Sequence, residues 1–197
     1  DLNQIEAENE YAYLSLGIYE ISPQHNLLAF GLDTTGAETY TIQFKNLETG
    51  ELLGDVIENA AGSAEWGDNT TLFYTTEEES TKRSDKLYRH ILGEGQSADI
   101  LLYHEPDQLY SVALYKTNDE RYLFVGSMGI ETYEWHYLDT DVPLGDFKLF
   151  AAREKALRYI VEHRAGTFYV VTNADGAVNS KLMTTSVIDT RRMSWQN

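Results

Sequence analysis

The sequence predicts an all-β fold, a partial β-propeller of about four four-stranded antiparallel blades. Short runs rich in β-branched and aromatic residues alternate with Gly, Asp and Asn turns, which is typical of neighbouring antiparallel strands. The runs also recur at a regular distance: 44 residues separate Phe30 from Tyr74, 51 separate Tyr74 from Val125, and 45 separate Val125 from Val170. A period near 45 fits one propeller blade. A β-sandwich of the same strands is the alternative, but it does not require matching loops at matching places.

The blades follow one another along the chain. Residues 1–16 are predicted to form a connector or the outer strand of a preceding blade. The four predicted blades span residues 17–58, 62–106, 109–152 and 157–197, and the last strand of the fourth is incomplete. In this scheme LLGDVI ends the first blade and SAEW begins the second, as two separate strands.

Large apolar and aromatic residues alternate with polar ones in two of the third strands, at Tyr40, Ile42 and Phe44 and at Tyr133, Trp135 and Tyr137. The aromatic stripe is predicted to be core, not a ligand cage. His90 and His136 are predicted to hold equivalent third-strand positions with a structural role. Because each sheet buries its faces against neighbouring blades, the end faces of a four-blade segment are expected to promote self-association.

Composition narrows the classes of function. The 15 Lys and Arg residues against 32 Asp and Glu give a net charge of −17, which argues against nucleic acid as a partner and favours cationic ligands. The absence of Cys excludes disulfides and thiolate zinc sites. No apolar run reaches the roughly 18 residues needed to cross a bilayer, so we expect a soluble chain without membrane contact. Its start at Asp1, without Met, suggests a fragment or a processed protein.

No motif in the chain predicts a catalytic residue, a metal or a cofactor. The G-x-S-x-G signature of hydrolases is absent, and Ser63 and Ser127 are interpreted as ordinary strand-end serines. The five histidines form no H-E-x-x-H pair. Gly93-Glu94-Gly95 lacks the last Gly of a dinucleotide fingerprint, and residues 173–176 lack the ligand spacing of a calcium loop, so both are interpreted as turns.

Several segments together resemble the propeller of oligopeptidase B, a branch of the prolyl oligopeptidase family. They are ISPQHNLLAFGLDTTGAETYTIQFKNLETGELL, the W-x-D-N-x-T-L-F-Y-T-T stretch, KLYRHILG and TNADGAVNSKL. The most specific part is YRHILG followed by DILLYHEPDQLYSVALYKT, since both the order and the spacing of the segments match. The resemblance runs almost from end to end.

This resemblance implies a function for the chain. The family joins a seven-bladed propeller to an α/β-hydrolase domain with a Ser, Asp, His triad, and this branch cleaves short peptides after Arg or Lys. The chain is then expected to be a noncatalytic segment that gates access of basic oligopeptides, with the α/β-hydrolase domain as its partner. The implied location is the cytoplasm, with the periplasm as the alternative. A stand-alone propeller that binds protein partners is the alternative function.

The resemblance also implies candidate contact residues. The loops between second and third strands, DTTGAE, EEESTKRSD, MGIE and NADGAVN, are expected on one propeller face, toward the catalytic domain. Within them Asp33, Glu38, Arg83 and Asp175 are the candidates for interdomain or substrate-facing contacts. Glu38 is a candidate to pair with a basic residue of the catalytic domain, and a solvated loop carboxylate is the alternative.

Overall fold

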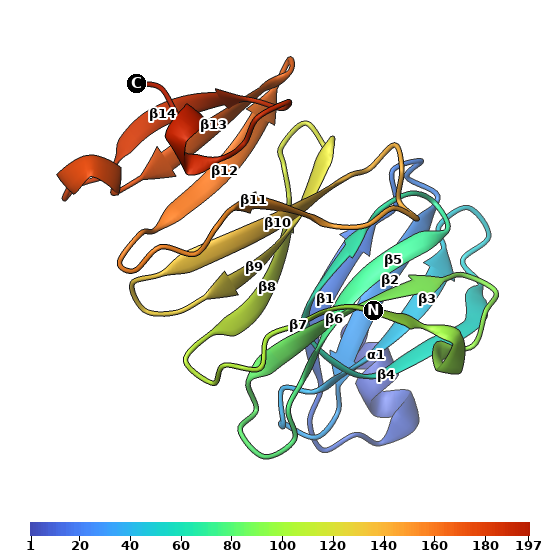
Figure 1. Ribbon diagram of the computed structural model, residues 1–197. Helices are drawn as coiled ribbons and strands as arrows, with labels where there is room; N and C mark the ends of the chain where they lie inside the picture. Colours follow the sequence, from blue (N-terminus) through green and yellow to red (C-terminus); the bar gives the residue numbers. More distant parts are fainter. The chain divides into compact units, whose positions relative to one another are not determined.

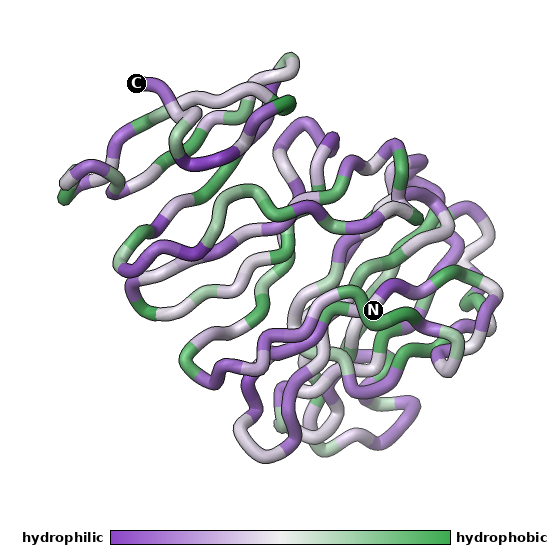
Figure 2. The backbone as a smooth tube through the Cα atoms, in the orientation of Figure 1, coloured by the Kyte–Doolittle hydropathy of each residue, from purple (hydrophilic) through white to green (hydrophobic).

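The computed structural model describes residues 1–197 and consists almost entirely of antiparallel β-strands (Figure 1). The chain divides into two compact units, residues 1–104 and residues 105–197. Hydrophobic stretches follow the strands, and the connecting loops are largely hydrophilic (Figure 2). The predicted all-β architecture is therefore confirmed at the level of secondary structure.

The first unit holds a single sheet of seven strands paired in chain order, every pair antiparallel. Its elements are α1 (Leu2–Asn9), β1 (Ser15–Ile21), β2 (Leu27–Asp33), β3 (Tyr40–Asn46), β4 (Leu52–Trp66), β5 (Thr71–Glu77), β6 (Ser84–Ile91), the short helix η1 (Gln96–Ala98) and β7 (Ile100–His104). Residues 2–9 are helical and capped by the Asp1 side chain, so they do not form the outer strand that was one prediction for this segment. None of the helices has the length and apolar character needed to cross a membrane.

One long strand, β4, joins two blades without a turn. Its first part pairs with β3 and its second part with β5, and Ala60 pairs with both neighbours. The runs LLGDVI and SAEW were predicted as separate strands, but they are the two ends of this strand. The residues between them, 60–64, are small, and the pairing of β4 with β5 shifts register there. We call β1–β3 with residues 52–58 the first blade, and residues 60–66 with β5–β7 the second blade.

The core of the first unit lies where these two blades face each other. Buried apolar side chains from both blades meet there: Ile18, Leu27, Ala29, Ile42, Phe44, Ile57, Ala60, Ala64, Trp66, Leu72 and Tyr74. Phe44 and Trp66 pack edge to face at 5.7 Å. The indole N–H of Trp66 donates to the carbonyl of Glu20 at 3.0 Å, so its one polar group is satisfied in the core.

The second unit holds two sheets. The elements are β8 (Ser111–Lys116), β9 (Tyr122–Met128), β10 (Tyr133–Asp139) and β11 (Lys148–Ala151), which form one sheet, then β12 (Tyr159–Arg164), β13 (Thr167–Thr172) and β14 (Lys181–Ser186), which form the other, with short helices η2 (Ala174–Gly176) and η3 (Arg192–Ser194). Trp135 lies in the core between them, and its indole N–H donates to the Tyr159 carbonyl at 2.8 Å. The prediction that the aromatic stripe of the third strand is core is confirmed for Trp135, while Tyr133 and Tyr137 pack against that core.

The strand register corrects the predicted equivalence of His90 and His136. His90 lies opposite Leu72, whereas His136 lies opposite Val125, which corresponds to Tyr74 in the second blade. The position equivalent to His90 is therefore Leu138. The loop before the third strand is longer in the second blade than in the following copy. Residues at the same place in the two sequence repeats therefore occupy different positions in their third strands.

Candidate functional site

The loop after β2 is organised by the buried carboxylate of Asp33, which is 1% exposed. One carboxylate oxygen accepts hydrogen bonds from the backbone N–H of Thr35 at 2.8 Å, the Thr35 hydroxyl at 2.9 Å and the Gly36 N–H at 3.0 Å. The other oxygen accepts from the Glu38 N–H at 2.8 Å. Asp33 thus fixes the conformation of the loop, while Glu38 is exposed at its tip.

Asp33 is held in its ionised form. Burial alone would raise its pKa, but the hydrogen bonds from Thr35, Glu38 and Gly36 outweigh burial and lower the pKa below its usual value. Glu38 adopts a left-handed backbone conformation with φ of 58°, which the hydrogen bond from its N–H to Asp33 supports. The candidate residues Asp33 and Glu38 therefore lie in one preorganised loop.

The neighbouring loop, between β5 and β6, is linked to the Asp33 loop by hydrogen bonds of the Thr39 hydroxyl. Glu77 accepts hydrogen bonds from the Thr39 hydroxyl at 2.7 Å and from the Lys82 ammonium at 2.5 Å. Lys82 also donates to Thr39 at 3.0 Å. The candidate Arg83 follows Lys82 and is half-buried, with its carbonyl accepting from the Glu78 N–H at 2.8 Å. The structure thus brings the loops of three of the four candidates together.

The fourth candidate, Asp175, lies in the second unit within η2. Its carboxylate pairs with the Lys181 ammonium at 2.9 Å and with the Arg192 guanidinium at 2.6 Å. The hydrogen bond from Lys181, followed by the charge of Arg192, lowers the pKa of Asp175. These contacts tie η2 to the start of β14 and to η3, so Asp175 has a local structural role in this unit.

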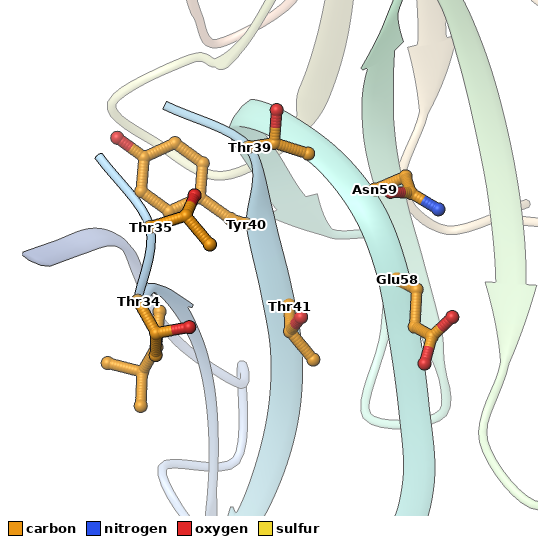
Figure 3. A pocket seen from close by; sticks show the side chains of 8 residues that line it. Thr34, Thr35, Thr39, Tyr40, Thr41, Glu58 and Asn59 are labelled. Carbon is orange, nitrogen blue, oxygen red and sulfur yellow. The ribbon is translucent and has the colours of Figure 1, made fainter. Parts of the chain in front are cut away.

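A hollow of about 330 Å³ opens beside the Asp33 loop on the sheet of the first blade (Figure 3). It is lined by Leu32, Thr34, Thr35, Thr39, Tyr40, Thr41, Glu58 and Asn59, from β2, β3, β4 and the loop between β2 and β3. Figure 3 shows Thr34, Thr41 and Glu58 on three successive segments around the opening. The lining combines hydroxyl groups with one exposed carboxylate.

A β-bulge in β4 places Glu58 and Asn59 in this wall. Tyr40 pairs with Ala60 and Ile42 pairs with Ile57, so both Glu58 and Asn59 lie opposite the single residue Thr41. Asn59 has a φ of 57°, in the left-handed region. Bulges of this kind redirect side chains and are frequent next to functional sites.

The side-chain amide of Gln96, in η1, replaces the strand partner that Glu58 loses at the bulge. Its oxygen accepts from the Glu58 N–H and its NH₂ donates to the Glu58 carbonyl, both at 2.9 Å. The backbone of Glu58 is therefore satisfied although it lies outside the regular ladder. This clamp fixes the backbone of Glu58 at the wall of the hollow.

Tyr40 closes the hollow on the side of β1. Its ring lies over Gly17, where any Cβ atom would come within 2.2 Å of the ring. Burial first, and then the negative charges of Glu38 and Asp33, raise the pKa of the Tyr40 phenol. Tyr40 therefore remains a neutral hydroxyl group at physiological pH.

A buried hydrogen-bonded chain connects Tyr74, Asp99 and His90 within the second blade, and Nε2 of His90 makes no hydrogen bond. The Tyr74 hydroxyl donates to one Asp99 oxygen at 2.7 Å, and the other Asp99 oxygen lies 2.7 Å from Nδ1 of His90. Nε2 of His90 lies 3.5 Å from Asp55, on β4 of the first blade. Burial and the Asp99 carboxylate raise the pKa of Tyr74. No Ser or Thr hydroxyl takes part, so the chain is not a nucleophilic triad.

Ser127, in the second unit, belongs to a polar cluster and not to a catalytic pair. Its hydroxyl donates to the buried carboxylate of Glu105, which also accepts from Arg153 at 2.5 Å. The Arg153 guanidinium stacks on the Tyr110 ring at 3.9 Å. Burial opposes ionisation of Glu105, but the hydrogen bonds from Ser127 and Arg153 lower its pKa. The carboxylate therefore holds the serine as an ordinary structural hydroxyl.

Sequence reasoning missed Glu58, Asn59 and Gln96. No motif marks them, because the bulge and the clamp arise from the path of β4 between two blades. The only local sign is the polar pair Glu58-Asn59 in front of the small residues 60–64. No group of three or more His, Cys, Asp or Glu side chains in the structure is arranged to hold a metal ion.

The antiparallel sheets, built from a strand order that repeats along the chain, define a segment of a β-propeller. The family model for the prolyl oligopeptidase N-terminal β-propeller domain matches residues 1–197. The chain therefore belongs to the prolyl oligopeptidase family and lies within its propeller domain.

Individual relatives agree with this assignment. The chain is 34% identical to dipeptidyl aminopeptidase BI of Pseudoxanthomonas mexicana over 198 residues, covering 100% of the chain and 27% of that protein. It is 36% identical to Protease 2 of Moraxella lacunata, covering 93% of the chain and 26% of that protein. The structure of oligopeptidase B from Leishmania major matches with a TM-score of 0.86 and 36% identity, covering 94% of the chain and 26% of that structure. The predicted family and the propeller fold are confirmed.

Proposed function

We propose that this chain is the noncatalytic wall of a serine peptidase that admits short basic peptides and cleaves them after Arg or Lys. The chain spans about a quarter of the length of the relatives it matches, so the peptidase activity is assigned to the protein of which it is a part. Similarity to oligopeptidase B supports the proposal. A wall of β-sheets around an active site excludes water and bulky substrates, and its opening controls entry.

The observation that carries the proposal is the acidic, preorganised loop face of the first unit. Asp33 is ionised and buried beneath the loop, and Glu38 and Glu58 are exposed around it. With a net charge of −17, the whole chain contributes to a negative potential at such a face. A field of this sign raises the local concentration of cationic ligands and speeds their association. Basic peptides are the substrates that this electrostatics favours.

The same loops support a docking role toward a catalytic domain. The loop pair is held together by Glu77, Lys82 and Thr39, and Glu38 stands exposed on it. We assign Glu38 to an ion pair with a basic residue of the catalytic domain. An exposed pair of this kind contributes about 0.2–1 kcal/mol, so it would tune opening and not hold the domains together by itself.

Hydrolysis assays with amide substrates test the proposal. The intact protein should cleave fluorogenic Arg and Lys amides and spare folded proteins, while the 197-residue chain alone should be inactive. Raising the salt concentration should lower kcat/KM for a basic peptide more than for a neutral one, because salt screens the field of the acidic face. Cleavage of neutral and basic amides at equal rates would refute the proposed specificity, and turnover by the purified chain would refute its noncatalytic role.

One observation favours a second candidate, a propeller that binds protein partners without a peptidase domain. The outer face of the sheet β12–β14 exposes a row of apolar side chains formed by Ile160, Val171 and Leu182, which lie opposite one another on successive strands. Exposed apolar faces of this kind mark interaction surfaces. The same row supports the expected self-association of the chain, which light scattering at increasing concentration would measure. A downstream G-x-S-x-G in the complete reading frame would exclude this candidate.

A further inference from the structure

We propose that the hollow on the first blade is a subsite for the ammonium group of a lysine side chain in a bound peptide. The inference deepens the proposed function and rests on it for the identity of the ligand as a basic peptide. It assigns that peptide a second point of recognition, on the propeller itself, apart from the residue that is cleaved. Glu58 is the anionic partner at this point.

The hollow offers polar groups that the fold leaves unpaired. The hydroxyls of Thr35 and Thr39 are already bonded to Asp33 and Glu77. The side chains of Thr34, Thr41, Tyr40, Asn59 and Glu58 also line the hollow and make no side-chain hydrogen bond or ion pair within the structure. An ammonium group carries three donors and no acceptor, so it matches one carboxylate together with hydroxyl and amide oxygens.

The charge around the hollow also favours a cation. Asp33 is ionised, and Glu38 and Glu58 add exposed carboxylates on two sides. Lys82 is the one basic residue bonded to a lining group, through Thr39, and its charge is paired with Glu77 at 2.5 Å. The local excess of negative charge therefore lies on the side of Glu58 and Glu38.

The second blade supplies an internal comparison. In the first blade Thr41 pairs with Leu32. Thr76, 44 residues after Leu32, holds the equivalent position in the second blade, and its partner there is Lys86. Lys86 is therefore the equivalent of Thr41. The second blade thus carries its own ammonium group at this register position, where it pairs with Asp85 at 2.7 Å. The first blade has a short hydroxyl side chain there, and its lining contains no Lys or Arg. A cation is compatible with this part of a blade, and in the first blade it has to come from a ligand.

The second blade also indicates that this part of a blade stays accessible when a neighbouring blade packs on it. Its face that bears Tyr74 and His90 packs on the first blade, where His90 stacks on Phe44 at 5.7 Å. On the same face, nearer the loops, the side chains of Lys86 and His104 remain 29% and 47% exposed. The equivalent end of the first blade is the location of the hollow, so a peptide side chain can reach it.

The test measures binding of a small lysine peptide to the complete 197-residue chain. The probe is N-acetyl-Gly-Lys-Gly amide, and the same peptide with norleucine in place of lysine is its neutral counterpart. Binding of each peptide is measured by calorimetry and by the NMR chemical shifts of the backbone amides. We expect the lysine peptide to shift the amides of Thr34, Thr41 and Asn59, and the norleucine peptide to leave them unchanged. Glu58→Gln should weaken binding about fivefold, which is the size expected for a partly exposed charge pair.

Three further variants, one test and two controls, keep the experiment decisive. Thr41→Lys reproduces the side chain of the second blade at the same register position and should abolish binding of the probe. The matched controls, Glu48→Gln and Thr49→Lys, change charge equally in the turn at the opposite end of β3 and should leave binding within a factor of two, as expected for remote exposed charges. Equal binding of both peptides, shifts confined to other loops, or equal effects of Glu58→Gln and Glu48→Gln would overturn the subsite.

The subsite and the proposed peptidase function can fail separately. Binding in the hollow without cleavage of Arg and Lys amides by the intact protein would support the subsite and refute the function. Cleavage of those amides together with unchanged amide chemical shifts in the hollow would support the function and refute the subsite.

Discussion

Replacing Tyr74 by Phe removes one hydroxyl from the buried hydrogen-bonded chain of Tyr74, Asp99 and His90 in the second blade. The Tyr74 residue is 2% exposed and the Asp99 side chain is 4% exposed, so water cannot replace the lost hydrogen bond without opening the structure. Removing one partner of a buried hydrogen bond, so that the other is left unsatisfied, costs about 1–3 kcal/mol. Because the ring itself is retained and no cavity larger than one oxygen forms, we expect a loss of about 2 kcal/mol.

Hydrogen exchange followed by mass spectrometry measures this loss within one unit of the chain. A loss of about 2 kcal/mol corresponds to a roughly 30-fold drop in the protection of core amides that exchange by opening of the unit. We expect this drop in peptides from β5 and β6 and unchanged protection in peptides from β12 and β13.

The matched control is Tyr88→Phe. Tyr88 stacks on Tyr74 with ring centroids 5.6 Å apart, and its hydroxyl makes no hydrogen bond in the structure. This variant should change protection by less than about twofold, in keeping with a substitution that removes no buried interaction. If Tyr74→Phe has no larger effect than Tyr88→Phe, the hydrogen bond from Tyr74 to Asp99 does not stabilise the unit.

Three further predictions concern local features. Gln96→Ala should raise the exchange rate of the Glu58 amide about fivefold or more, as expected for a lost hydrogen bond of about 1 kcal/mol, and NMR would show whether it does. Gly126→Ala should unfold the second unit at lower urea, by about 2 kcal/mol or more, because its Cβ would lie 2.3 Å from the Trp135 ring; an unchanged midpoint would contradict this packing. The folded-state pKa of Glu105 lies below its unfolded value, so its contribution to stability is present above about pH 4.5 and is lost as the pH falls through the folded pKa. Urea midpoints from pH 6 to pH 3 should therefore fall more steeply for the native chain than for Glu105→Gln.

The strands were predictable because their side chains alternate and their turns carry Gly, Asp and Asn. Phe30, Tyr74 and Val125 were expected on second strands, and all three lie there. Two features were not predictable. The continuity of β4 depends on pairing with two different neighbours, and the helix at residues 2–9 buries no residue and so leaves no periodic pattern. Both depend on tertiary context and not on a local signal.

The candidate site residues also differ in whether a local sequence signal or the tertiary structure determines their role. Asp33 was selected as a surface contact, but a carboxylate followed by Thr, Thr and Gly can equally cap its own loop, and the structure has it doing so. Glu58 was not selected because its role depends on the bulge opposite Thr41 and on the amide of Gln96, 38 residues later in the chain. A contact between residues so far apart in the chain leaves no local pattern from which a single sequence could predict it.

Comparison of the blades separates positions that build the fold from positions that distinguish one copy from another. The second strands align with each other. Phe44 and Trp66 lie in the core of the first unit, and Trp135 and Phe168 lie in the core of the second. At the ends near the loops the copies diverge: Thr41 in the first blade stands where Lys86 stands in the second. A core position that changes would cost several kcal/mol through cavities or strain, whereas a half-exposed strand end tolerates either residue. The differences between copies at these ends are therefore free to specify ligands, and a lysine introduced at position 41 should remove a function while leaving the fold intact.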